Sequence, residues 1–184
     1  MNGMAAGLDG LKMSSSKAPS TKIEFLDDPE TVRWKISEAL CEEGNVSENG
    51  VLGILRDVLI PISELRLERL QGKIGVNLAE GRGIMSDQWP FISDNAPDGT
   101  VFTIEAKDTS VSQHYSSYDE IERDFAQKKL QPTALKAAVA DTFNRLLAPI
   151  RKAYAESEEW QAVDKLAYPD SGLIGSPEDP SIGI

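Results

Sequence analysis

The sequence has little of what disulfides, secretion and membrane insertion require. Its only cysteine is Cys41, which cannot form a disulfide within the chain and is typical of a reducing compartment. No apolar run approaches the roughly 18 residues of a membrane-spanning helix. The first eleven residues lack the basic start and the apolar stretch of a secretory signal. We therefore expect a cytoplasmic protein with no membrane segment, and we assign no metal site.

Positive charge is also scarce. The chain has 19 Lys and Arg against 30 Asp and Glu, which gives a net charge of −11. Non-specific binding to nucleic acid depends on neutralising phosphates, so this balance argues against it. A contact with RNA would have to come from a local basic patch, or from unpaired bases that are stacked and read at their edges.

What is present indicates one globular domain, mostly helical, with a small β-hairpin. Hydrophobic residues make up 40% of the 184 residues. Asp28, Pro29 and Glu30 are typical of a helix start, because the carboxylate caps the first amides and proline fits the first turn. Pro61 is expected to end the second helix. Apolar residues at three- and four-residue spacing predict helices at about 28–41 and 51–59, helices that begin at 118 and at 132 or 133, and a short helix at 158–166. Alternating apolar residues predict a strand within 65–70 and a hairpin in which 101–105 pairs with 115–118.

Two segments lack any apolar period. Residues 72–98 carry several Gly, Asp and Asn residues, and we interpret them as an inserted loop. Residues 170–184 are rich in Gly, Ser, Pro and Asp, and we predict a disordered tail.

One short motif suggests chemistry, namely Lys12-Met13-Ser14-Ser15-Ser16. A lysine beside small hydroxyl residues can meet a polyphosphate. The ammonium supplies positive charge where negative charge develops, and hydroxyls and backbone amides add hydrogen bonds. Gly7 and Gly10 leave the loop free to close. By itself the pentapeptide is a weak signal and is more typical of a solvated linker.

The wider context of the motif resembles the eukaryotic cytosolic tyrosyl-tRNA synthetases around and after their KMSKS loop. The similarity runs in one order from Met1 to Asp170, and agreement of many segments in order is more specific than any one of them. The segments are Met1 to Met4, Gly7-Leu8, Lys12 to Ser16, Ser20 to Ile23, Leu26-Asp27, Glu43 to Val46, Glu48 to Leu52, Tyr118 to Phe125, Leu130 to Pro132, Leu135-Lys136, Leu146 to Arg151 and Ala167 to Asp170.

The resemblance implies a class I aminoacyl-tRNA synthetase, which joins tyrosine to ATP, releases pyrophosphate and passes tyrosine to its tRNA. Lys12 would stabilise the departing pyrophosphate, with Ser14 and Ser16 shaping the loop. Ser15 stands where bacterial-type motifs have a second lysine. Lys12, Ser14, Ser15 and Ser16 are thus the candidate catalytic residues, and Lys12, Met13 and Ser14 the candidate nucleotide-binding residues. ATP, accompanied by Mg²⁺, would be a substrate, and no prosthetic group is implied.

The same resemblance makes residues 28–169 the helical anticodon-binding domain and residues 1–27 the loop and its connection. Related enzymes hold the first anticodon base with a His-Pro-x-Asp pattern, where this chain reads Gln131, Pro132, Thr133 and Ala134. Gln131 can still bond a base edge, whereas Ala134 cannot. A stacking aromatic is also replaced, and His114 or Tyr115 can take its place. The candidate tRNA-binding residues are His114, Tyr115, Gln131, Pro132 and Lys136.

The family's catalytic half, a doubly wound nucleotide-binding sheet, has no counterpart here, and the chain contains one histidine. We therefore expect a C-terminal fragment that does not form tyrosyl-adenylate alone. Its partner would be tyrosine tRNA, with tyrosine and ATP in the full-length enzyme. The family is homodimeric, whereas this chain is expected to be monomeric. The alternative is a standalone helical module that binds RNA or protein without catalysis.

Overall fold

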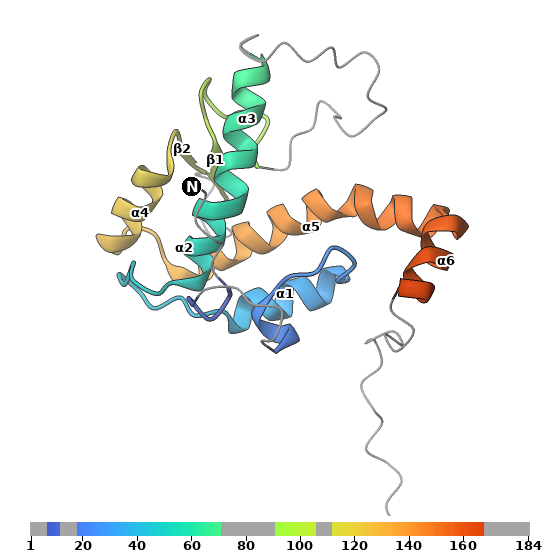
Figure 1. Ribbon diagram of the computed structural model, residues 1–184. Helices are drawn as coiled ribbons and strands as arrows, with labels where there is room; N and C mark the ends of the chain where they lie inside the picture. Colours follow the sequence, from blue (N-terminus) through green and yellow to red (C-terminus); the bar gives the residue numbers. More distant parts are fainter. Residues whose placement is uncertain (1–6, 12–17, 71–90, 106–111, 168–184) are drawn as a thin grey trace, which may run out of the picture.

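Helices form most of the described chain, and a two-stranded sheet packs among them (Figure 1). The computed structural model describes residues 7–11, 18–70, 91–105 and 112–167. The elements are η1 (Pro19–Thr21), α1 (Pro29–Glu38), α2 (Gly50–Ile54), η2 (Leu55–Leu59), α3 (Ile60–Leu70), β1 (Phe102–Ile104), β2 (Gln113–Tyr115), α4 (Tyr118–Ala126), α5 (Pro132–Glu156) and α6 (Glu158–Ala167). The expected mostly helical fold with a small sheet is therefore confirmed. The predicted tail at 170–184 lies outside the described residues.

Helix α1 begins as its sequence predicts. The Asp28 side chain accepts hydrogen bonds from the backbone amides of Glu30 and Thr31, at 2.8 and 3.0 Å, and Pro29 occupies the first turn. The Thr31 hydroxyl donates to the same carboxylate at 2.6 Å, and this bond, together with those from the amides, lowers the pKa of Asp28. The cap fixes where the chain turns from the preceding loop into the helix.

The second helix does not end at Pro61, so that prediction is wrong. Helix α2, the η2 turn and α3 follow one another without a break to Leu70. The η2 turn is π-helical, and the amide of Ile60 bonds the Leu55 carbonyl five residues back. A π turn is one of the few devices that let a helix accommodate a residue lacking an N–H. The helix therefore continues through Pro61, and its hydrogen-bond pattern shifts from α to π in the turn before the proline.

The strand predicted within residues 65–70 is also wrong, because these residues belong to α3. Helical geometry leaves Leu65 exposed and Leu67 half-buried, so the two leucines do not share the single face that alternation implied. Ser63 is fully buried, and its hydroxyl donates to the Val101 carbonyl at 2.6 Å. This bond fixes α3 beside the sheet.

The hairpin exists, but its second strand starts earlier than expected. Strands β1 and β2 are antiparallel, with Phe102 opposite Tyr115, Thr103 opposite His114 and Ile104 opposite Gln113. The first strand lies within the predicted 101–105 segment. The partner was expected at 115–118, where Tyr118 in fact begins α4.

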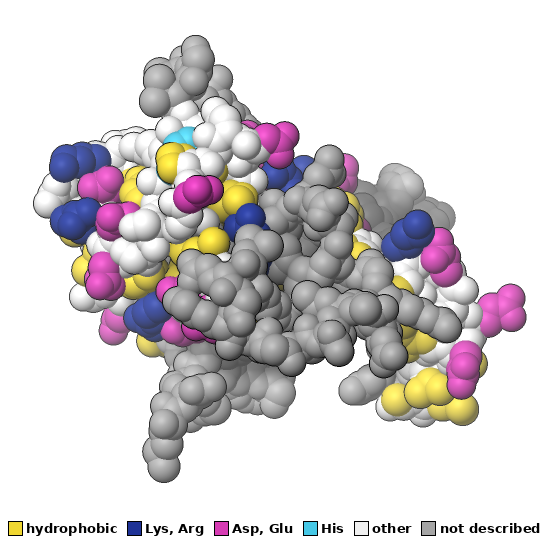
Figure 2. Space-filling view, turned by 90° about the horizontal axis from the view of Figure 1, so that it is seen from above, with side chains coloured by type: hydrophobic (Ala, Val, Ile, Leu, Met, Phe, Trp, Pro, Cys, Tyr) yellow, Lys and Arg dark blue, Asp and Glu magenta, His cyan; other side chains and the backbone are white. Residues whose placement is uncertain are grey.

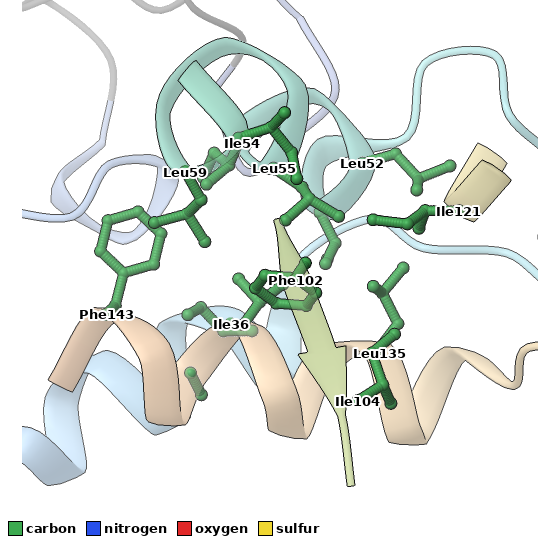
Figure 3. Packing of buried hydrophobic residues seen from close by; sticks show 14 of the residues in the cluster. Ile36, Leu52, Ile54, Leu55, Leu59, Phe102, Ile104, Ile121, Leu135 and Phe143 are labelled. Carbon is green, nitrogen blue, oxygen red and sulfur yellow. The ribbon is translucent and has the colours of Figure 1, made fainter. Parts of the chain in front are cut away.

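The core lies between the α2–α3 helix on one side and α1 with α5 on the other, and β1 runs through it (Figure 3). All three β1 residues are buried. Phe91, inside the predicted 72–98 loop, is only 1% exposed, and its carbonyl accepts from the Thr103 amide at 2.8 Å. The described end of that segment is therefore anchored in the core, and residues 71–90 lie outside the described chain.

Helix α6 stands apart from this core, at the far end of α5 (Figure 1). It confirms the helix predicted at 158–166. Its contact with α5 includes an edge-to-face pair of Trp160 and Tyr154, whose ring centroids are 5.4 Å apart. None of its residues is buried, so α6 contributes little to the stability of the domain.

Candidate functional site

The motif at residues 12–16 lies outside the described residues, so Lys12, Met13, Ser14, Ser15 and Ser16 are not placed. The base of its loop is described on both sides. The Leu8 amide donates to the Thr21 carbonyl at 2.9 Å, which holds the two flanks of the loop together. The Leu40 amide, just past the end of α1, donates to the Leu8 carbonyl at 2.9 Å. Leu8 thus ties the loop to itself and to the helical domain.

Side-chain packing reinforces this base. Leu8 is 2% exposed and belongs to the same hydrophobic core as the helices. The backbones approach so closely that a Cβ on Gly50 would lie 2.1 Å from the Leu8 carbonyl oxygen. A Cβ on Gly10, whose φ is +75°, would lie 1.9 Å from the Glu48 carbonyl oxygen. Only glycine fits both positions, so the sequence specifies the contact from both sides.

His114 and Tyr115 lie on β2 and point to opposite faces of the hairpin, as strand alternation requires. The Nδ1 of His114 lies 3.1 Å from the Thr103 hydroxyl, which also accepts the Ser93 amide at 3.2 Å. His114 as a whole is half-buried, so it is not closed off from solvent.

Tyr115 belongs to the core. It is 4% exposed, and burial, with smaller contributions from Asp124 and Glu120, raises its pKa to about 12. A buried ring cannot stack on an RNA base without local opening. Tyr115 therefore supports the hairpin from inside, whereas His114 remains accessible.

Gln131, Pro132 and Lys136 lie at the start of α5. Gln131 occupies the N-cap position, but its side chain does not cap the helix. Its Nε2 donates instead to Glu43 Oε1 at 3.1 Å, in the turn after α1. Lys136 Nζ donates to the Ser37 carbonyl at 2.7 Å, near the C-terminus of α1, where a cation complements the helix dipole. These side chains join α5 to α1.

The two groups of predicted tRNA-binding residues thus bond to different parts of the fold. Within the described residues, no hydrogen bond or ion pair joins His114 or Tyr115 to Gln131 or Lys136. Strand β1 and α5 nevertheless pack together. A pocket of about 70 Å³ between them is bordered by Thr103 and Arg145, so the hydroxyl partner of His114 faces α5. Sequence spacing did not indicate this proximity.

Sequence reasoning also missed Glu43 and Lys128. Their charged groups lie 3.7 Å apart beside Gln131, and both side chains are exposed. Lys128 has a positive φ of 58°, which turns the chain between α4 and α5. Figure 2 shows Lys and Arg side chains interspersed with Asp and Glu on the visible described surface, without one continuous basic region. This agrees with the expectation that any RNA contact here is local.

Neither a metal cluster nor a membrane span emerges from the described residues. No group of three or more His, Cys, Asp or Glu side chains there is arranged to hold a metal ion. No helix in the same ranges is long and apolar enough to cross a bilayer.

Comparison with known proteins assigns the chain to a family. The family model described as "tRNA synthetases class I (W and Y)" matches residues 1–148. The cytoplasmic tyrosine–tRNA ligase of Saccharomyces cerevisiae is 37% identical over 170 residues, which cover 92% of this chain and 36% of the relative. The tyrosine–tRNA ligase of Haloarcula marismortui is 30% identical and covers 91% of this chain and 38% of its own length.

Solved structures give the same result. Tyrosyl-tRNA synthetase of Archaeoglobus fulgidus, crystallised with L-tyrosine, superimposes with a TM-score of 0.53 at 31% identity, covering 80% of this chain and 34% of that one. The enzyme of Aeropyrum pernix gives 0.58 at 27% identity, covering 89% and 37%. The chain thus spans about a third of the length of these relatives. From these matches and the helical fold that supports them, we conclude that the chain belongs to the class I tRNA synthetases of the tryptophan and tyrosine type.

Proposed function

We propose that this chain is the C-terminal part of a tyrosine–tRNA ligase. The full-length enzyme would condense tyrosine with ATP, releasing pyrophosphate, and would transfer tyrosine from the adenylate to its tRNA, releasing AMP. This chain would supply the loop that faces the ATP phosphates and the domain that binds the tRNA anticodon. The cytoplasm is its proposed compartment. The full-length enzyme would be a homodimer, and this chain alone a monomer.

The observation that supports this proposal best is the joining of the loop base to the helical domain. Leu8 bonds both Thr21 and Leu40 through its backbone, and its side chain lies in the helical core. The segment carrying Lys12 therefore starts from a fixed point on the domain that would hold the tRNA. The loop that takes part in activating tyrosine and the domain that selects tRNA would then be held in one fixed arrangement.

Within this proposal, residues 1–27 form the loop and its connection, residues 28–169 the anticodon-binding domain, and residues 170–184 a tail. Lys12 would place its ammonium beside the departing pyrophosphate, with Met13 and Ser14 beside the nucleotide and Ser14, Ser15 and Ser16 supplying hydroxyl groups. Mg²⁺ would enter with ATP. The described residues hold no group of three or more His, Cys, Asp or Glu side chains arranged for a metal ion, so we assign it no ligand among them.

For the anticodon, the geometry favours His114 and Gln131 over the other candidates. His114 is partly accessible, and Gln131 is exposed next to Glu43. An amide and a carboxylate side by side present donors and acceptors that can bond a base edge. Tyr115 is buried and the Lys136 ammonium bonds the Ser37 carbonyl of α1, so we assign both residues a structural role. Pro132 would set the direction of the first turn of α5.

A binding titration tests the proposal. The purified chain is titrated with tyrosine tRNA and with a non-cognate tRNA at two salt concentrations. Preferential binding of tyrosine tRNA that persists at the higher salt is expected, because base contacts depend less on salt than phosphate contacts do. Equal binding of both tRNAs, or binding that disappears with salt, would contradict an anticodon-reading domain.

A further inference from the structure

Two connections of the chain meet at the start of α5. The connection from α1 to α2 carries Glu43 and Gly44, and the connection from α4 to α5 carries Lys128 and Gln131 (Figure 1). Gly44 has a φ of +74°, and a Cβ there would lie 3.1 Å from the Cε of Lys128, so the lysine stem passes close over the glycine. The lysine ammonium lies 3.7 Å from Glu43 Oε2. The fold therefore brings a charged pair beside the first turn of α5.

This arrangement fixes which way the Gln131 amide faces. Its Nε2 donates to Glu43 Oε1 at 3.1 Å and to the Lys128 carbonyl oxygen at 3.4 Å. A carboxylate and a backbone carbonyl only accept hydrogen bonds, so the amide nitrogen must face both of them and the amide oxygen must face away. Gln131 is exposed, and no donor among the described residues bonds its Oε1. Gln131 therefore offers an acceptor to a ligand.

Glu43 adds further acceptors next to this oxygen. An ionised carboxylate has about four lone-pair positions, and the Gln131 amide occupies one of them. The Glu43 side chain is 43% exposed, so a ligand can reach the others. Two neighbouring acceptors match a ligand edge with two neighbouring donors. Among the standard bases, only guanine has such a Watson–Crick edge, formed by its N1–H and its N2 amino group.

We propose that Glu43 is a base-reading residue, which accepts a hydrogen bond from the donor edge of a guanine in the anticodon, with Gln131 as the neighbouring acceptor. This inference rests on the proposed function. Ala134, in the first turn of α5, has only a methyl group, so the acceptor comes from the connection after α1 and not from α5 itself. The tyrosine codons UAU and UAC require the anticodon GUA, which contains one guanine, at its first position.

The charge of Glu43 distinguishes this role from a purely structural one. A carboxylate repels RNA phosphates, and the chain already has a net charge of −11. If Glu43 did not contact the base, its removal would strengthen the binding of every RNA. Removal of a base contact instead weakens the binding of the RNA that carries the matching base. Lys128 partly neutralises the carboxylate, which limits the desolvation cost when a base covers it.

Binding of two tyrosine tRNAs by the full 184-residue chain tests the proposal. One carries guanine at the first anticodon position and the other carries adenine, whose N1 is an acceptor where guanine has a donor. We expect the parent to bind the guanine tRNA at least about tenfold more tightly, as the loss of one hydrogen bond to a charged group predicts. In Glu43→Ala, affinity for the guanine tRNA should fall and the preference should shrink to about twofold or less. Filter binding at one fixed salt concentration measures both.

Glu42→Ala is the matched control. It removes the same charge from the neighbouring residue, which is also exposed and whose carboxylate accepts a hydrogen bond from Asn45 at 3.1 Å. This variant should keep the parent's preference for guanine over adenine. Since Glu42 and Glu43 are both exposed, neither substitution should unfold the chain, and circular dichroism checks this.

Three results would overturn the proposal while the proposed function stands, provided that both tyrosine tRNAs still bind more tightly than a non-cognate tRNA. The parent binds the guanine and adenine tRNAs alike. Glu43→Ala strengthens the binding of both equally, as removal of a negative charge alone would do. Glu42→Ala loses the preference as fully as Glu43→Ala. A parent that binds tyrosine tRNA no better than the non-cognate tRNA would instead contradict the proposed function, and this inference with it.

Discussion

The ammonium of Lys35 lies 2.7 Å from the Asp27 carboxylate, and the two side chains are only 6 and 11% exposed. The same Asp27 oxygen accepts the Glu24 amide at 2.8 Å. This pair joins the connecting segment to α1 in a place from which water is almost excluded. A buried pair of this kind sets the geometry of the connection more than it adds to stability, because desolvation offsets much of the attraction.

Removing one partner should be costly. Lys35→Met leaves the Asp27 carboxylate buried without its counter-charge, and we expect the free energy of unfolding to fall by about 3 kcal/mol. Urea unfolding followed by circular dichroism measures it. Arg33→Met is the matched control, because the Arg33–Asp141 pair is 3.4 Å apart and exposed, and should change stability by less than about 1 kcal/mol. The double variant Lys35→Met with Asp27→Asn should recover part of the loss. No recovery would mean that the lysine stem, rather than the charge pair, stabilises the connection.

Burial of Tyr115 predicts a loss of stability in alkali. Its pKa is raised to about 12, against about 10 for a solvated phenol, so the folded state holds the proton more tightly than the unfolded state. The contribution is complete below pH 10 and is lost as pH rises from 10 to 12. We expect stability to fall by about 2 kcal/mol over this window, and Tyr115→Phe to lessen the fall.

Unfolding by urea at a series of alkaline pH values would measure this effect. Tyr154→Phe is the control, because Tyr154 is less buried than Tyr115 and its hydroxyl bonds Asp164 at 2.9 Å. That variant should keep most of the alkaline loss. If Tyr115→Phe and the parent lose stability in parallel, the buried phenol is not the cause.

Gly50→Ala should loosen the loop base. The added Cβ would lie 2.1 Å from the Leu8 carbonyl oxygen, so one backbone must move. We expect a loss of about 2 kcal/mol and faster proteolytic cleavage between Leu11 and Ala18. Gly99→Asn is the control, since a Cβ there meets nothing within 4 Å and asparagine tolerates its φ of +84°. Equal cleavage rates in the parent and Gly50→Ala would show that Leu8 does not hold the loop.

Substitution of Lys136 distinguishes a structural role of its side chain from a role in binding RNA. Because its ammonium bonds the Ser37 carbonyl, we expect Lys136→Met to lower stability by about 1 kcal/mol. Affinity of the folded protein for tyrosine tRNA should stay within about twofold, or about 0.4 kcal/mol. Thermal unfolding and filter binding measure the two quantities. A tenfold loss of affinity at unchanged stability would instead make Lys136 an RNA contact.

The isolated chain should not exchange pyrophosphate into ATP in the presence of tyrosine. The described residues contain one two-stranded sheet and no nucleotide-binding doubly wound sheet. The measurement is incorporation of labelled pyrophosphate, with a complete tyrosine–tRNA ligase as positive control. Exchange that disappears in Lys12→Ala would contradict this expectation.

Sequence reasoning succeeded where a local signal matched the tertiary environment. The Asp28-Pro29 cap, the long periodic stripe of α5 and the short α6 all formed near their predicted positions. It failed from Pro61 to Leu70, where proline and alternation, both usually reliable, indicated the wrong structure. The reason is non-local: Ser63 bonds Val101, and packing against the sheet favours a helix through the proline.

The candidate site was only partly accessible to the same reasoning. Tyr115 was predicted only as a candidate stacking residue, whereas the strand that carries it packs in the core and buries its ring. That Lys136 and Gln131 bond Ser37 and Glu43 depends on how α5 crosses α1, 88 or more residues apart along the chain. Neither periodicity nor family resemblance encodes such a crossing.

The backbone hydrogen bonds that hold Leu8 also limit how far Lys12 can extend from the helical domain. Lys12 follows Leu8 by four residues, so their Cα atoms can be separated by no more than about 14 Å, at up to 3.6 Å per residue. Any phosphate that this lysine meets must then lie inside a sphere centred near the end of α1. The length of chain between Leu8 and Lys12 sets the radius of that sphere. It limits where a nucleotide that contacts Lys12 can lie, whatever partner the chain binds.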